Sequence, residues 1–472
     1  MRASRRTNVV LIVADDLGYG DLACFGNPIV RTPNLDRLCE QGTALTQHYA
    51  ASPLCAPARA ALLTGRYNHR TGAVDVPSNR GLDRISPRER TIADEFQSQG
   101  YATGMVGKWH NGLHSRQHHP NAKGFREFVG FLNGGMDYYQ WVLDRNGQTE
   151  LFDGRYLTDV FTDEAVGFIR RHSDTPFFLY LAYNAPHAPL QAPEPLTKRY
   201  RQLGTLSEEV CCLYAMIEQM DAGIGRILDT LARLNLAEDT IVLFTSDNGP
   251  WLRGGYARHN GPFRGGKGEV YEGGIRVPAI LRWPKELEPG RTLDAPIHCC
   301  DWLPTLLELA GLRRTGELPL DGIPQRRYLV HGKPIGPQPP RFWQRNRYEP
   351  IAHSNAAIRE DQWKLVWPMR EGADRKEPED NVWYQRGLIS PHQLCAIDPH
   401  LPSWPVEPPC PPQLYDLDRD PGEATDLAAD QPGRIAAMTE AGDDWFAEVT
   451  AEWQQARQLN LTPDPGCPES PR

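Results

Sequence analysis

Short, continuously apolar runs that end abruptly in polar residues recur along the chain, and they predict buried strands. Four such runs span residues 9–14, 101–106, 177–183 and 241–245. Between them, residues 34–41, 92–99, 158–171 and 210–234 have the apolar spacing of helices. Fully apolar strands that alternate with helices are typical of a mostly parallel sheet covered on both faces. We therefore expect an α/β fold with one large, mixed but mostly parallel sheet sandwiched by helices.

The pattern changes after about residue 345. Residues 356–367 alternate as in a β-hairpin, 414–417 indicate a further strand, and 430–455 indicate a closing helix. The Pro-rich stretch 368–412 is weakly patterned, and we expect it to be an irregular insert near the mouth of the site. These features predict a catalytic domain over residues 1–345 and a C-terminal subdomain with a small antiparallel sheet over residues 346–472.

Composition excludes several classes of protein. With 51 basic and 60 acidic residues the net charge is −9, which argues against a nucleic-acid partner. No apolar run is long enough to span a membrane. The apolar run 9–14 is too short for a signal peptide, and the ten cysteines have no CxxC spacing. We therefore expect free thiols and a cytoplasmic protein, although a different native N-terminus would permit export to the periplasm or beyond. The oligomeric state stays open.

Pairs of oxygen ligands follow two of the predicted strands. Asp15 and Asp16 end the first apolar run, and Asp247 and Asn248 follow the run at 241–245. Each pair alone could simply cap a following helix or turn. Two such pairs on two core strands favour a shared site instead, because ligands bind at the carboxyl ends of such strands. Carboxylate and amide oxygens suit a hard cation, Ca²⁺ or else Mg²⁺.

The segment from residue 52 to 66, SPLCAPARAALLTGR, predicts a helix with a cysteine at its start. Pro57 suits the first turn and Gly65 suits the end of such a helix. Cys55 would thus lie where backbone N–H groups favour an anion, and Arg59 would share its face. A buried structural cysteine is the alternative interpretation.

These motifs, in this order, resemble the formylglycine-dependent sulfatases, arylsulfatase-like members of the alkaline phosphatase superfamily. Cys55-x-Pro57-x-Arg59 followed by LLTGR is similar to the family signature in which the cysteine is oxidised to a formylglycine aldehyde. Further segments similar to family motifs are GKWH at 107–110, APHAP at 185–189, SDNG at 246–249, GGKG and YEGG between 265 and 274, and LYDL at 414–417. The resemblance covers nearly the whole chain.

The resemblance implies an alkaline-phosphatase-like fold and hydrolysis of a sulfate monoester to an alcohol and inorganic sulfate. A hydrate of the formylglycine at position 55 would be the nucleophile, and a formylglycine-generating enzyme would be the partner in maturation. The residues with implied catalytic roles are Cys55, Arg59, Lys108, His110, His187, Asp247 and Lys267. The implied metal ligands are Asp15, Asp16, Cys55, Asp247 and Asn248.

The substrate is less well defined by the sequence. The segment 123–139 looks most like that of sulfatases acting on simple or carbohydrate esters, so we expect a sulfated carbohydrate or an aryl sulfate. His259, Asn260 and Arg264 lie in a glycine-rich loop before Lys267 and are candidate substrate contacts, although ordinary loop polarity explains them as well. A phosphodiester or phosphonate monoester hydrolase with the same machinery is an alternative. A non-catalytic binding protein, with Cys55 unmodified, is another.

Overall fold

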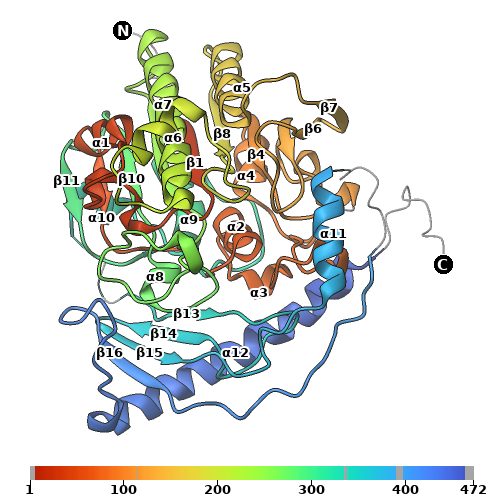
Figure 1. Cartoon of the computed structure of the whole chain (residues 1–472), viewed down its shortest axis with the longest axis vertical. Coiled ribbons are helices and arrows are strands. Elements are labelled where there is room, and N and C mark those ends of the chain that lie inside the picture. The colour runs from red at the N-terminus through yellow and green to blue at the C-terminus, as the bar shows by residue number, and fades with distance from the viewer. Residues whose placement is uncertain (1–5, 114, 334–335, 337, 390–396, 463–472) are drawn as a thin grey trace.

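A ten-stranded mixed sheet forms the centre of the computed structural model, which describes residues 6–113, 115–333, 336, 338–389 and 397–462 (Figure 1). Its strands lie in the order β11 (Arg291–Leu293), β2 (Thr43–Leu45), β10 (Ala279–Arg282), β9 (Thr240–Ser246), β1 (Asn8–Ala14), β8 (Phe177–Ala182), β4 (Ala102–Lys108), β5 (Glu127–Phe131), β6 (Val142–Arg145) and β7 (Gln148–Leu151). The five strands from β9 to β5 are mutually parallel. The four predicted strands are among these five, and the predicted mostly parallel sheet is confirmed.

Helices cover both faces of this sheet because its central strands are apolar on both sides. In β1, Val10 and Ile12 face one core, whereas Val9 and Leu11 face the other. The first core is closed by α1 (Pro33–Glu40), α5 (Leu157–Arg171), α6 (Glu194–Arg201) and α7 (Glu208–Arg233). The second is closed by α2 (Cys55–Thr64), α4 (Ile92–Ser98), α9 (Trp302–Leu309) and α10 (Arg326–His331). The four predicted helices correspond to α1, α4, α5 and α7, and their ends agree to within two residues.

A separate four-stranded antiparallel sheet lies near the C-terminus (Figure 1). It consists of β13 (Arg341–Gln344), β14 (Ala356–Glu360), β15 (Trp363–Trp367) and β16 (Gln413–Asp416). The predicted small sheet is therefore confirmed, with β13 as an additional strand that begins at Arg341. The closing helix α12 (Pro432–Asn460) packs along this sheet and against α3 (Asn68–Thr71). Its Glu452 forms an ion pair with Arg88 at 3.0 Å and also pairs with Arg66 and Arg70.

The insert between β15 and β16 contains a helix that the sequence pattern did not predict. This helix, α11 (Pro378–Ile389), begins with a proline and carries Glu379 and Asp380 in its first turn, which are favourable helix-start residues. Asp380 Oδ1 accepts an ion-paired hydrogen bond from Arg80 Nε at 2.8 Å. This contact connects α11 to the 3₁₀ turn η3 (Ser78–Arg80). The expectation of an irregular insert is thus wrong for these residues.

Within the described residues, no helix is both long enough and apolar enough to span a membrane. The eight cysteines in that part of the chain are all free thiols, as the sequence predicts. Cys211 on α7 is buried, whereas the adjacent Cys212 is partly exposed.

Candidate active site

Four neighbouring strands of the large sheet, β9, β1, β8 and β4, bring the candidate residues together at their carboxyl ends. The residues at these strand ends and in the loops that follow are Asp15, Asp16, Lys108, His187, Asp247 and Asn248. Their strands are adjacent and parallel, so their side chains converge on one edge of the sheet. The convergence that the sequence pattern predicts is therefore present.

Each of the three carboxylates in this cluster is paired with at least one cation of the chain, and Asp15 also lies 3.6 Å from Arg59 Nη2. The closest contacts are Lys108 Nζ to Asp15 Oδ2 at 2.7 Å, Lys267 Nζ to Asp16 Oδ2 at 2.7 Å, and Arg59 Nη2 to Asp247 Oδ2 at 2.8 Å. Burial raises the pKa of Asp16, but Lys267 and His187 outweigh burial and hold that pKa below its ordinary value. Buried cations of the chain therefore already neutralise the three crowded acids in part.

The site nevertheless has the oxygen atoms that a hard cation requires. Ligand atoms of Asp15, Asp16, Cys55 and His187 all lie within 4.8 Å of one another. Asp15 Oδ1 and Asn248 Oδ1 are buried and have no hydrogen-bond partner. Buried acceptor atoms without a donor are costly, so these two oxygens are placed to bind a cation. Carboxylate and amide oxygens favour Ca²⁺ or Mg²⁺ over softer ions.

Cys55 is the first residue of α2, as the sequence predicts. The helix ends at Gly65, which adopts the left-handed conformation with φ 68°. The thiol lies 3.9 Å from Asp16 Oδ1. Burial raises the pKa of the Cys55 thiol to about 12, although Lys108 and Lys267 act in the opposite direction. The helix N-terminus and the two lysines together make this position suitable for a group that develops negative charge.

Two histidines lie near Cys55, and their rings differ in hydrogen bonding. His187 Nδ1 lies 2.6 Å from the carbonyl oxygen of Ala188, so Nδ1 carries the proton and Nε2 faces Asp16 Oδ2 at 3.7 Å. Burial and Lys267 lower the pKa of His187 to about 3. His110 is buried with Nδ1 unpartnered, and burial together with Lys108 lowers its pKa well below the ordinary value. Both rings are therefore available for proton transfer.

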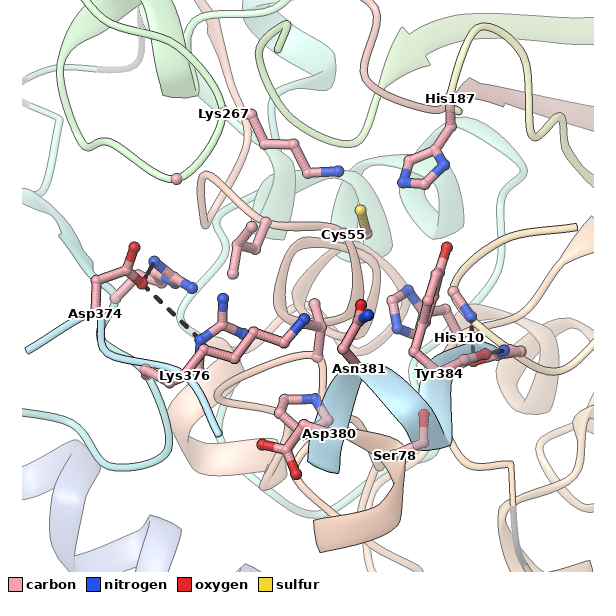
Figure 2. A pocket seen from close by; sticks show the side chains of 18 of the residues that line it. Cys55, Ser78, His110, His187, Lys267, Asp374, Lys376, Asp380, Asn381 and Tyr384 are labelled. Carbon is pink, nitrogen blue, oxygen red and sulfur yellow. Dashed lines mark hydrogen bonds and ion pairs between the residues drawn. The ribbon is translucent and has the colours of Figure 1, made fainter. Parts of the chain in front are cut away.

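Cys55, His110, His187 and Lys267 line one cavity of about 380 Å³. In Figure 2, Lys267, His187 and His110 surround Cys55, and the labelled residues of α11 lie below it in the view, on the wall of the same cavity. The walls that sequence analysis did not identify come from four segments. These walls include Ser78, Asn79, Asn133, Arg345, Arg347, Asp374, Lys376, Asp380, Asn381, Trp383 and Tyr384. The expectation that the insert lies near the mouth of the site is supported by this position of α11.

The three weaker candidates do not line this cavity. His259 Nδ1 lies 3.3 Å from the carbonyl oxygen of Gly20, and Asn260 donates to the carbonyl of Gly273 at 3.4 Å. Arg264 donates to the Tyr415 hydroxyl of β16 at 2.9 Å. These contacts are structural, so the geometry gives the three residues no direct contact with a ligand beside Cys55.

Comparison with known proteins identifies the family. A family model for sulfatases matches residues 7–312, which is more than half of the chain. The chain belongs to the sulfatase family. It is 33% identical to steryl-sulfatase of Mus musculus over 93% of this chain and 81% of that protein. It is 32% identical to arylsulfatase A of Homo sapiens over 93% of this chain and 87% of that protein.

A solved structure extends the similarity to the whole fold. The crystal structure of Ps i-CgsB in complex with k-i-k-neocarrahexaose has a TM-score of 0.79 and 29% identity, and the match covers 97% of this chain and 98% of that one. The sulfatase is therefore a sulfuric ester hydrolase with an alkaline-phosphatase-like fold. Sulfatases generally use a metal ion and a formylglycine derived from cysteine, and the cluster around Cys55 has suitable ligand atoms.

Proposed function

We propose that this sulfatase hydrolyses a sulfated saccharide, with formylglycine made from Cys55 as the nucleophile. We further propose that Asp15, Asp16, Asp247 and Asn248 hold the metal ion, Ca²⁺ in preference to Mg²⁺, with the converted side chain at position 55 as a further ligand. The supporting observation is that a cysteine with the conversion motif lines one cavity together with His110, His187 and Lys267, and lies beside the buried Asp15 and Asp16. Maturation would require a formylglycine-generating enzyme as partner.

The cavity supports a saccharide as the organic part of the substrate. Its volume of about 380 Å³ suits a compact ligand. Trp251 and Tyr384 offer aromatic faces, and Asn79 and Asn381 offer amide groups for ring hydroxyls. The relative Ps i-CgsB is similar over nearly its whole length and its crystal structure contains an oligosaccharide.

The cations of the site would bind the oxygens of the sulfate group. Lys108 donates to Asp15, Lys267 donates to Asp16, and Arg59 donates to Asp247. A bound metal ion and the formylglycine hydrate would supply a Lewis acid and a hydroxyl nucleophile. Fixed positive groups in a buried site stabilise charge that develops on sulfate oxygens, because they need no reorganisation during the reaction.

Proton transfer would fall to the two histidines and to Asp247. His187 Nε2 lines the cavity next to Lys267 but carries no proton in the neutral ring, so the departing alcohol would take its proton from Lys267, or from His187 once that ring is protonated in the substrate complex. His110 is neutral at pH 7 because burial lowers its pKa, so its ring can accept a proton from the group at position 55. Asp247 would assist the attack of the nucleophile, and burial raises its pKa to about 6.

Peptide-mass determination tests the nucleophile directly. Oxidation of a cysteine thiol to formylglycine lowers the peptide mass by about 18 Da, and a hydrazide traps the aldehyde. We expect this change in protein co-produced with a formylglycine-generating enzyme, together with release of sulfate from 4-methylumbelliferyl sulfate. A Cys55→Ala variant, which cannot be converted, is the matched control. An unmodified thiol with full sulfatase activity would refute the proposal.

A substrate panel tests the saccharide and the bond that is cleaved. We expect sulfate release from at least one sulfated mono- or oligosaccharide, with kcat/KM on sulfate esters above that on matched phosphodiesters and phosphonates. Activity confined to aryl or steroid sulfates would exclude the saccharide. Faster cleavage of the phosphorus esters would favour the alternative hydrolase.

A further inference from the structure

A group of cations lies on the wall of the cavity that the C-terminal region supplies. Arg345 and Arg347 follow β13, and Lys376 precedes α11. All three line the same cavity as Cys55. In Figure 2, Lys376 and Asp374 lie on the side of the cavity opposite His110 and Tyr384. This wall is therefore distinct from the cluster of acids and cations around the reacting group.

The nearby carboxylates do not neutralise all of these cations. The carboxylate of Asp374 accepts a hydrogen bond from Arg345 at 2.5 Å, and the carboxylate of Asp75 accepts one from Arg347 at 3.0 Å. Asp380 also lines the cavity, but its carboxylate is taken by Arg80 at 2.8 Å. Lys376 has neither an ion pair nor a hydrogen bond to any other residue that the structure describes. Its ammonium group thus has no direct partner at the cavity, although the carboxylates of Asp380, Asp75 and Asp374 act on its charge from a distance.

The two arginines also retain donors that the protein leaves unused. The Nε atoms of Arg345 and Arg347 are buried and have no hydrogen-bond partner. The side chain of Arg345 is only 3% exposed. Of the other charged residues that line the cavity, Lys267 is paired with Asp16, and Arg253 and Glu269 are one of each sign. Unused buried donors beside an unpaired ammonium group are the features of an anion-binding site.

We propose that Lys376, together with Arg345 and Arg347, forms a second anion-binding subsite. The preferred substrates would then carry a second sulfate or a carboxylate on the same sugar as the reacting sulfate or on its neighbour. The cavity of about 380 Å³ holds both Cys55 and Lys376, which limits how far apart the two anionic groups can be. This inference rests on the proposed function, because it assumes that the reacting sulfate binds at Cys55.

Inhibition by simple sulfonates tests the subsite without knowledge of the natural substrate. The probes are alkane-α,ω-disulfonates with spacers of two to six carbons, the matched alkane monosulfonates, and ω-sulfonated carboxylates. Each competes with hydrolysis of 4-methylumbelliferyl sulfate. At one spacer length we expect a disulfonate to bind about tenfold more tightly than its monosulfonate, as one charge-assisted hydrogen bond allows. The sulfonated carboxylates show whether a carboxylate is accepted as the second group.

Variants at Lys376 attribute the effect to the subsite. In Lys376→Met, the ratio of the inhibition constant of the monosulfonate to that of the best disulfonate should fall to about two, which is the statistical factor for a probe with two identical ends. Lys376→Arg should retain the higher ratio. Lys198→Met, which removes an exposed lysine on α6, should leave the ratio unchanged. A disulfonate advantage of no more than twofold at every length, or an unchanged ratio in Lys376→Met, would overturn the proposal. No hydrolysis of 4-methylumbelliferyl sulfate by the converted protein would instead contradict the proposed function.

Discussion

A buried ionic cluster joins the C-terminal sheet to the loop of Lys267, and it gives a prediction about stability. Lys364 on β15 lies 2.9 Å from Glu272 on α8 (Glu272–Ile275) and 2.9 Å from Glu423. The side chains of all three are fully buried. Lys364→Met keeps the length of the side chain but leaves two carboxylates without their lysine. We expect a large loss of stability and a displaced Lys267 loop.

Two estimates of the loss agree in magnitude. Removal of one partner of a buried ion pair costs about 3–5 kcal/mol, because the other charge stays buried and unpaired. Burial raises the pKa of Glu272, but Lys364 and two arginines outweigh burial and lower it from 4.5 to about 2. This shift corresponds to roughly 3 kcal/mol. Since the arginines remain in the variant, we expect Lys364→Met to lower the free energy of unfolding by about 3 kcal/mol.

Urea unfolding at pH 7 measures this loss, with Lys198→Met as the control for loss of an exposed lysine. Combining Lys364→Met with Glu423→Gln should recover part of the stability, because one unpaired charge is removed. The pKa of Glu272 is depressed in the folded protein, so its contribution is present above pH 4.5 and is lost as the pH falls through 2. The difference in the free energy of unfolding between Lys364→Met and the parent should therefore shrink as the pH falls. A loss below about 1 kcal/mol with unchanged kcat/KM would refute this reasoning.

Three further predictions concern the cavity and its surroundings. In Gly134→Ala, the new Cβ would lie 2.7 Å from His110 Cε1, so the ring must move, and kcat/KM for 4-methylumbelliferyl sulfate should fall by about tenfold or more without loss of folding. In Asn248→Ala, the Ca²⁺ concentration that gives half-maximal activity after treatment with a chelator should rise about tenfold, and an unchanged titration would exclude this ligand. Burial raises the pKa of Asp83 from 3.8 to about 6. The contribution of its protonated form to the stability of the fold is therefore present below pH 3.8 and is lost as the pH rises through 6. Urea unfolding should therefore show Asp83→Asn gaining about 3 kcal/mol relative to the parent between pH 4 and pH 8.

The parts of the fold that could be predicted are those in which burial alone dictates the sequence pattern. Strands β1, β8 and β9 are buried along their whole length, so continuous apolar runs mark them. Strand β7, in contrast, lies at an edge with exposed residues such as Leu151, and the short β10 runs antiparallel to β9. Helix α11 has only a weak apolar face. Their positions depend on contacts with distant segments, which no local pattern records.

The same distinction applies to the site. Residues at strand ends, such as Asp15 and Lys108, could be predicted to meet because parallel strands share one edge. Arg264 lies only three residues from Lys267, but the Tyr415 hydroxyl of β16 binds its guanidinium group outside the cavity. Lys376 and Tyr384 line the cavity because α11 folds back towards η3, more than 290 residues earlier in the chain. Only the tertiary structure reveals such residues.

The reacting groups and the substrate wall therefore come from different parts of the chain. Most of the charged residues around Cys55, such as Asp15, Lys108 and Asp247, lie at the ends of buried strands of the large sheet, where a shift of one residue would disturb the core. The facing wall, with Lys376 and Tyr384, comes from an insert whose residues are largely exposed. Changes in that wall can alter which ester binds while the groups that cleave it stay in place. The exception is Lys364, whose buried ion pairs connect the C-terminal sheet to the loop of Lys267. Substitutions in the insert should thus act on KM and selectivity, whereas those at Lys364 should also lower kcat.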